Sequence, residues 1–266
     1  MKISYNSKSY STRFKEMFMS ESLHAKSAYV SGASRGIGKA IAIELASKGY
    51  NLALTCRNNS VLLTELKEQL ERDFHVHVLT FTGDVSDFNF MKSVAEETLH
   101  TYPSIDCVVN NAGISHIGLL TDMSLDEWNR VINIDLNSLF ISSKLFIPSM
   151  IQKKCGRIIN ISSMWGTYGA SMEVAYSAAK GGVNTFTKAL AKELAPSNIS
   201  VNAITCGVID TDMNKCFSEE ETQALIDEIP AGRMAATSEV AKTVSSIIEA
   251  PIYMTGQIIG LDGGIY

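Results

Sequence analysis

From residue 26 onward, short apolar runs alternate with longer stretches in which apolar positions recur every three or four residues. The short runs predict strands at 27–31, 51–55, 76–81, 105–110, 157–162, 199–204 and 257–261. They show little polar alternation, so we expect them to be buried on both faces. The longer stretches predict helices at 37–48, 60–72, 87–102, 124–151 and 174–194. This order of strands and helices predicts an α/β fold with one doubly wound, seven-stranded parallel sheet flanked by helices.

The first 25 residues differ from the rest in being polar and rich in serine. They lack the apolar core of about 7–15 residues that a secretory signal carries. We expect residues 1–25 to form a flexible N-terminal extension, or translation to begin at Met17 or Met19. A transit peptide is a further alternative, although Glu16 and Glu21 are atypical of one. The domain is expected to span residues 26–266.

Composition excludes several classes of protein. The 266 residues are 45% hydrophobic and 19% charged, as in ordinary globular domains. No apolar run approaches the ~18 residues of a membrane span, and a net charge of −5 does not favour nucleic acid as a partner. The five cysteines are odd in number and form no C-x-x-C pair, so we expect no metal site and a reduced, cytoplasmic protein.

A glycine-rich turn, SGASRGIG, spans residues 31–38 between the first predicted strand and the first helix. Glycines allow the backbone to turn sharply and to approach a pyrophosphate, whose charge is favoured at a helix N-terminus. Taken alone, the pattern fits an ordinary turn as well as a dinucleotide site.

Basic residues indicate which dinucleotide such a turn would bind. The second predicted strand and the residues that follow it read NLALTCRNN, which lacks the acidic residue that NAD enzymes place on the ribose. Arg57 follows this strand and Arg35 lies in the glycine turn. With no carboxylate expected beside them, the two guanidinium groups suit a 2′-phosphate and predict NADP(H). The alternative is that both are solvated surface arginines.

Tyr176 and Lys180 form the pattern Y-S-A-A-K in a predicted helix, and the i, i+4 spacing places them on one face. A nearby ammonium stabilises a phenolate and lowers the tyrosine pKa, which allows proton transfer at a substrate oxygen. Ser163 ends a predicted strand, where open α/β sheets bind ligands, and its hydroxyl can stabilise an oxyanion.

Together with Asp84-Val85, Asn110-Asn111-Ala112-Gly113, residues 209–211 and the terminal LDGG, these motifs resemble a short-chain dehydrogenase/reductase across residues 27–266. The resemblance implies a Rossmann-type domain and a homotetramer assembled through the helices at 124–151 and 174–194. It implies Ser163, Tyr176, Lys180 and the residue at position 135 as the catalytic set. The implied cofactor-binding residues are Gly32, Ser34, Arg35, Gly36, Ile37, Arg57, Asp84, Val85, Asn110, Ala112, Gly113, Tyr176, Lys180, Ile209 and Thr211.

Two positions depart from the family pattern. Asp135 stands where the family often has an active-site asparagine, and its carboxylate could pair with Lys180. We expect activity to survive, because the family residue acts partly through its backbone carbonyl. Cys206 replaces the usual proline before Gly207, which predicts a looser loop. Nothing in the sequence places a base or cation to activate its thiol.

The stretches SLDEWNRVI, GRIINISS and YMTGQIIGLDGG are most similar to bacterial 3-oxoacyl-acyl-carrier-protein reductases. The stretch 162–199 also resembles reductases of a 5-aminopentanone group on elongation factor P, and hydroxysteroid dehydrogenases share the scaffold. Residues 210–228 hold seven acidic residues and one lysine, which would attract a cationic amine or simply be solvated. The non-enzymatic alternative is an NADP-binding regulator.

Overall fold

Seven parallel strands form one sheet in the computed structural model, which describes residues 25–212 and 218–265. The strand order is β3-β2-β1-β4-β5-β6-β7, as a doubly wound Rossmann-type fold requires, so the predicted fold class is confirmed. The strands are β1 (Ser27–Val30), β2 (Asn51–Cys56), β3 (Val78–Thr82), β4 (Cys107–Asn110), β5 (Gly156–Ser163), β6 (Ile199–Cys206) and β7 (Ile258–Leu261).

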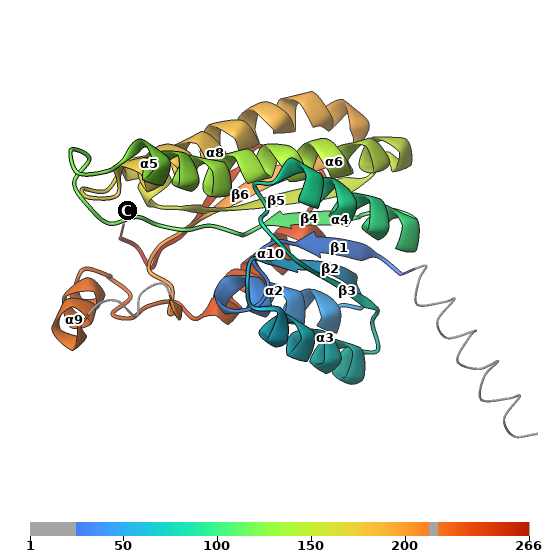
Figure 1. Cartoon of the computed structure of the whole chain (residues 1–266), viewed down its shortest axis with the longest axis horizontal. Helices are drawn as coiled ribbons and strands as arrows, with labels where there is room; N and C mark the ends of the chain where they lie inside the picture. The colour runs from blue at the N-terminus through green and yellow to red at the C-terminus, as the bar shows by residue number, and fades with distance from the viewer. Residues whose placement is uncertain (1–24, 213–217, 266) are drawn as a thin grey trace, which may run out of the picture.

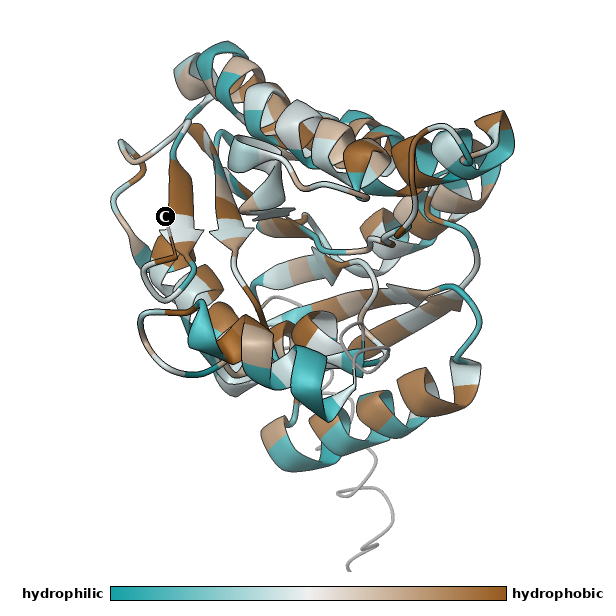
Figure 2. Cartoon of the chain, turned by 90° about the vertical axis from the view of Figure 1, so that its left-hand side faces the viewer, coloured by the Kyte–Doolittle hydropathy of each residue, from teal (hydrophilic) through white to brown (hydrophobic). Residues whose placement is uncertain are grey.

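Helices cover both faces of the sheet (Figure 1). On one face α2 (Gly36–Ser47), α3 (Ser60–Phe74) and α10 (Thr237–Glu249) pack over one buried apolar cluster. On the other face α4 (Phe88–Thr101), α6 (Ser138–Lys153) and α8 (Val174–Leu194) pack over a second cluster. Figure 2 shows hydrophobic residues concentrated on the strands between these layers. The shorter elements are α5 (Leu125–Ile132), η1 (Asn133–Asn137), α7 (Trp165–Tyr168), η2 (Ala195–Ser197) and α9 (Glu219–Asp227).

Local chemistry sets where several helices begin. The Asp87 side chain accepts hydrogen bonds from the amides of Asn89 and Phe90, which starts α4. Ser124 and Glu127 form a reciprocal capping box at the start of α5. The predicted helix at 124–151 is wrong in one respect, because a π-helical turn, η1, separates α5 from α6. That turn shifts the register of the side chains that follow it.

The prediction that all strands are buried on both faces is wrong for β3 and β7. Both lie at the edges of the sheet and are only partly buried. Helix α10 was not predicted, because its sequence is rich in serine, threonine and valine, which are weak helix formers. Tertiary packing decides its conformation, since Val240, Val244 and Ile248 are buried against the core.

Two absences hold for the described part of the chain. No helix there has both the length and the apolar character that crossing a membrane requires. Histidine, cysteine, aspartate and glutamate side chains in the same ranges do not gather into groups of three or more that could hold a metal ion. Nearly all of the predicted N-terminal extension, residues 1–24, lies outside the described residues.

Candidate active site

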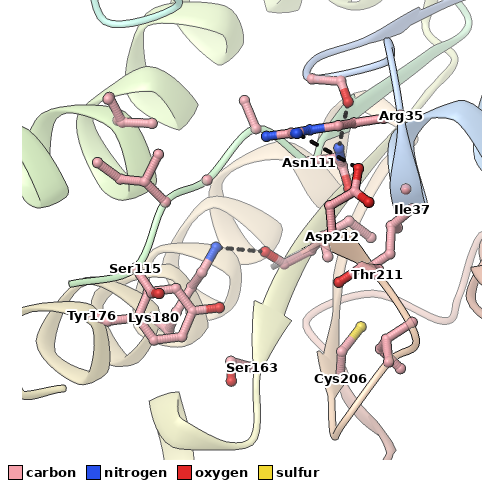
Figure 3. A pocket seen from close by; sticks show the side chains of 18 of the residues that line it. Arg35, Ile37, Asn111, Ser115, Ser163, Tyr176, Lys180, Cys206, Thr211 and Asp212 are labelled. Atoms are coloured by element: carbon pink, nitrogen blue, oxygen red, sulfur yellow. Dashed lines mark hydrogen bonds and ion pairs between the residues drawn. The ribbon is translucent and has the colours of Figure 1, made fainter. Parts of the chain in front are cut away.

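A cleft of about 830 Å³ opens at the carboxyl ends of β1, β2, β4, β5 and β6, where open α/β sheets bind ligands. Figure 3 shows Tyr176, Lys180 and Ser163 in this cleft with Arg35 and Thr211. Of the predicted site residues, those that line it are Gly32, Ser34, Arg35, Gly36, Ile37, Arg57, Asp84, Val85, Ala112, Gly113, Ser163, Tyr176, Lys180, Ile209 and Thr211. Asn110 and Asp135 do not line it.

The glycine turn shapes one end of the cleft. Gly32 and Gly36 have positive φ angles of 67° and 55°, which side-chain-bearing residues rarely adopt. A Cβ on Gly38 would lie 2.3 Å from the carbonyl oxygen of Gly32, so the helix can approach the turn this closely only with glycine there. Arg35 occupies the N-cap of α2 without a side-chain hydrogen bond to the helix. Among the described residues no side chain is seen to accept a hydrogen bond from the first amides of α2, so these amides are available to an anion.

The two arginines predicted to bind a 2′-phosphate each have a carboxylate partner. Arg57 Nη2 lies 3.2 Å from Asp84 Oδ2, and Arg35 Nη1 lies 3.6 Å from Asp212 Oδ2. The expectation that no carboxylate lies near them is wrong, because β2, β3 and the segment after β6 bring acids from distant parts of the sequence to the same edge. Both guanidinium groups remain well exposed, so each pair is a solvated contact that an incoming anion can share.

Tyr176, Lys180 and Ser163 come together as the sequence predicts. Lys180 Nζ lies 5.4 Å from the centroid of the Tyr176 ring and donates a hydrogen bond to the carbonyl of Ile161 on β5 (3.1 Å). Ser163 Oγ accepts a hydrogen bond from the amide of Trp165 (3.2 Å), and its own proton can be donated to Tyr176 or to a ligand. The arrangement offers a phenol, a hydroxyl donor and a buried ammonium around one point of the cleft.

Asp135 lies on η1 behind this group and is fully buried. Its Oδ2 is 3.2 Å from Lys180 Nζ, and its Oδ1 accepts a hydrogen bond from the amide of Ile114 (2.8 Å). The pairing with Lys180 considered from the sequence is therefore present. Asp135 contacts Lys180 and does not line the cleft, so any effect it has on a ligand must pass through Lys180.

The environment of the group sets the protonation of Tyr176 and Lys180. Burial raises the pKa of Tyr176, and the Asp135 carboxylate raises it further, which together outweigh the lowering by Lys180 and by a hydrogen bond with Ser163. Burial lowers the pKa of Lys180, but the neighbouring Asp135 and Tyr176 more than offset this and the net shift is upward. At neutral pH the site therefore holds a neutral phenol beside a charged ammonium.

Asn110 lies beneath the cleft. Its side-chain amide donates to Asn160 Oδ1 (2.9 Å) and accepts from Ser142 (2.6 Å). Asn160 in turn donates to Thr187 of α8 (2.9 Å). This chain of buried hydrogen bonds joins α6, β4, β5 and α8, so the Asn110 side chain links the elements below the cleft.

Cys206 is the last residue of β6 and is buried at the cleft wall. In the sheet Cys206 pairs with Ser163 of β5 on one side and with Leu261 of β7 on the other. Burial raises the pKa of its thiol to about 12. The thiol is therefore protonated at neutral pH, which agrees with the absence of an activating group in the sequence.

Comparison with known proteins places the chain in a family. A model described as short chain dehydrogenase matches residues 26–222. An uncharacterized oxidoreductase of Bacillus subtilis, YmfI, is 40% identical over 240 residues, which cover 90% of this chain and 98% of that relative. The chain belongs to the short-chain dehydrogenase family. As a short-chain dehydrogenase it is an oxidoreductase acting on CH–OH or C=O groups, and the resemblance inferred from its motifs is confirmed.

Other relatives of this short-chain dehydrogenase have a named activity. The 3-oxoacyl-[acyl-carrier-protein] reductases FabG of Pseudomonas aeruginosa and Salmonella typhimurium are 39% and 36% identical over 249 and 246 residues. Each match covers 92% of this chain and 99% of the relative.

Sequence reasoning missed several polar residues that line the cleft, among them Glu173. Glu173 lies at the N-cap of α8, lines the cleft and is half-buried. Burial alone raises the pKa of its carboxyl, and no side-chain hydrogen bond or ion pair joins it to the described residues. Its position three residues before Tyr176 was the available signal. Met164 and Trp165 add apolar surface to the lining of the cleft.

Proposed function

We propose that this protein is an NADPH-dependent reductase that converts a ketone to an alcohol, in the manner of 3-oxoacyl-acyl-carrier-protein reductases. The observation that carries the proposal is the convergence of Tyr176, Lys180 and Ser163 on one point of the cleft. The FabG relatives, which match nearly the whole chain, support the same reaction class.

The residues present fit a nicotinamide dinucleotide phosphate. The open amides of α2, with the close approach at Gly38, form a cradle for the pyrophosphate. Arg35 and Arg57 would hold the 2′-phosphate, and both are exposed enough to reorient from their carboxylate partners. Lys180 would bind the ribose of the nicotinamide half, and bound NADPH would supply the hydride.

The chain's own residues then manage the substrate oxygen. Ser163 accepts a hydrogen bond from the Trp165 amide, and its own hydroxyl proton would be donated to the carbonyl oxygen, which orients the ketone. Tyr176 gives its phenolic proton to the same oxygen as negative charge develops there. Lys180 lies close enough to stabilise the phenolate that remains. Glu173 and Trp165 line the part of the cleft beside these groups.

The test is NADPH oxidation with a β-ketoacyl thioester, comparing the wild type with Tyr176→Phe. The substitution removes only the hydroxyl, so we expect the turnover number to fall at least ~100-fold while NADPH still binds. Equal rates in both proteins would refute the mechanism. Tight NADPH binding without turnover on a panel of ketones and steroids would favour the regulator.

Glu173 favours one substrate within this class. A half-buried carboxylate without a partner among the described residues attracts a cation. Helix α9, whose Leu225 lines the cleft, also carries Glu219, Glu220 and Glu221 in its first turn. These charges support, as a second candidate, the reduction of the 5-aminopentanone group on a lysine of elongation factor P. They would repel an acidic acyl-carrier protein.

Two measurements separate these substrates. Elongation factor P from a strain lacking this protein would carry the unreduced ketone, visible in mass spectrometry, if it is the substrate. In vitro, an amino ketone and its uncharged methyl analogue should differ in KM, and Glu173→Gln should remove the difference. A preference for the β-ketoacyl thioester over both would assign the acyl-carrier-protein reaction.

The oligomeric state and the location of the protein are a further part of the proposal. We propose a cytoplasmic homotetramer that buries the exposed apolar residues of α6 and α8, among them Phe140, Ile151 and Val174. Light scattering of the purified full chain tests this, and a monomer would contradict it.

A further inference from the structure

Asp135 and Lys180 form a buried ion pair directly behind the phenol of Tyr176. The carboxylate has no exposed surface and the ammonium side chain is 4% exposed. Their charged atoms are 3.2 Å apart, and the ammonium also donates to the carbonyl of Ile161. Water is therefore excluded from one side of the pair, so its charges act strongly on the neighbouring ring.

The surrounding backbone accommodates a carboxylate at this position. The amide of Ile114 donates to Asp135 Oδ1 at 2.8 Å. A Cβ on Gly113 would lie 2.7 Å from Asp135 Oδ2 and 3.3 Å from Lys180 Nζ, so the absence of a side chain at 113 leaves room for the pair. The π-helical turn η1 sets the direction of the Asp135 side chain.

Several groups face the couple of Tyr176 and Lys180 from the elements packed against it. Asp135 does so from η1, Cys206 from β6 and Ser163 from β5. Cys206 is a neutral thiol and Ser163 is a neutral hydroxyl, so among these described groups Asp135 is the one carboxyl. Burial raises the pKa of Asp135, while the Lys180 ammonium and the hydrogen bond from the Ile114 amide oppose that shift and favour its carboxylate form. The carboxylate compensates the positive charge of Lys180, which would otherwise favour the phenolate of Tyr176.

We propose that Asp135 sets the pH range of the reaction by keeping Tyr176 a proton donor into alkaline solution. This rests on the proposed function of the same site. Ketone reduction needs the protonated phenol, so reduction continues with rising pH until Tyr176 ionises. Alcohol oxidation needs the phenolate, so it begins only at higher pH. At any one pH the ratio of the two directions is fixed by the equilibrium constant. Asp135 thus moves the pH range and leaves the equilibrium unchanged.

The experiment measures kcat/KM for ketone reduction against pH in the wild type and in Asp135→Asn, which keeps the side-chain shape and removes the charge. We expect the alkaline decline to move to lower pH by about one unit in the variant. Asn137→Asp is the matched control, because it adds a carboxylate on the same turn where the native side chain contacts Asn133 and not Lys180. Its profile should stay with the wild type.

A second readout does not depend on activity. Ultraviolet titration of the protein without cofactor follows the ionisation of tyrosines, and the transition that Tyr176→Phe removes belongs to Tyr176. This transition should occur at lower pH in Asp135→Asn, and in Asp135→Ser if the first variant does not fold. Coincident titrations, or a shift to higher pH, would overturn the inference. A wild type without ketone reduction would refute the proposed function, while the titration would still decide the role of Asp135.

Discussion

Arg57 and Asp84 form an ion pair with 3.2 Å between guanidinium and carboxylate at the end of the cleft where a 2′-phosphate would bind. Asp84 is held in place, because its Oδ1 accepts hydrogen bonds from the amide and the hydroxyl of Ser86. Arg57 is the exposed and movable member. A phosphate would therefore have to share this guanidinium with a carboxylate or turn it away.

The first prediction concerns cofactor choice. Arg57→Ala should weaken NADPH binding by at least ~10-fold, because a charge-assisted contact to a phosphate contributes roughly 1.5–3 kcal/mol. NADH, which lacks the phosphate, should lose little. Fluorescence titration of both nucleotides measures the two dissociation constants. Arg72→Ala is a surface control, because the Arg72 guanidinium pairs with its neighbour Asp73 and does not line the cleft. Parallel losses for NADPH and NADH would remove the phosphate assignment.

The second prediction concerns Ser163. Ser163→Ala should lower the turnover number for ketone reduction by about 10²–10³-fold, because it removes a donor aimed at the developing oxyanion. The neighbouring Ser162 is the control, since its hydroxyl bonds to Asn184 and to the carbonyl of Lys180. Ser162→Ala should cost about 1 kcal/mol of unfolding free energy and leave turnover within a few-fold. An unchanged turnover number in Ser163→Ala would contradict the assigned role of the Ser163 hydroxyl.

The third prediction concerns the space at Gly113. Gly113→Ala should push Asp135 from Lys180 and cost about 1–3 kcal/mol in unfolding free energy, as overpacking of a buried site does. Chemical denaturation measures the loss, and activity should fall with it. Gly118→Ala in the same segment is the control, because its Cβ would meet only the tip of the His116 ring at 3.2 Å, which can turn away. Equal stability of the two variants would show that the site at Gly113 relaxes easily.

The fourth prediction concerns thiol chemistry. Burial raises the pKa of Cys206 to about 12, so it should resist alkylation by iodoacetamide at neutral pH, while the exposed Cys155 reacts. Peptide mass spectrometry after timed labelling identifies the modified positions, and Cys155→Ser should remove the early product at position 155. Rapid labelling of Cys206 accompanied by loss of activity would mean that the cleft wall opens in solution.

Local sequence was sufficient for those parts of the site that one element carries. Tyr176 and Lys180 are one helical turn apart, so their shared face follows from the spacing alone. Ser163 was found because it ends a strand in a parallel sheet, and such ends meet at one edge.

Contacts between distant elements could not be predicted in this way. The pairing of Arg57 with Asp84 depends on β2 and β3 ending side by side. Asn110 was expected to line the cofactor site, but the direction of its side chain depends on the pleat of β4 and on Asn160 and Ser142 beside it. The burial of Asp135 depends on the π-helical turn, and no motif in the sequence predicts that turn.

The hydrogen bonds that run from Ser142 through Asn110 and Asn160 to Thr187 tie four elements together under the cleft. A polar network of this kind is strong only while every member keeps its partner. Partial opening at any of these elements would leave several buried amide and hydroxyl groups without hydrogen-bond partners at once. The distance between Tyr176 on α8 and Ser163 on β5 should therefore stay the same without any ligand and change only when the sheet itself unfolds.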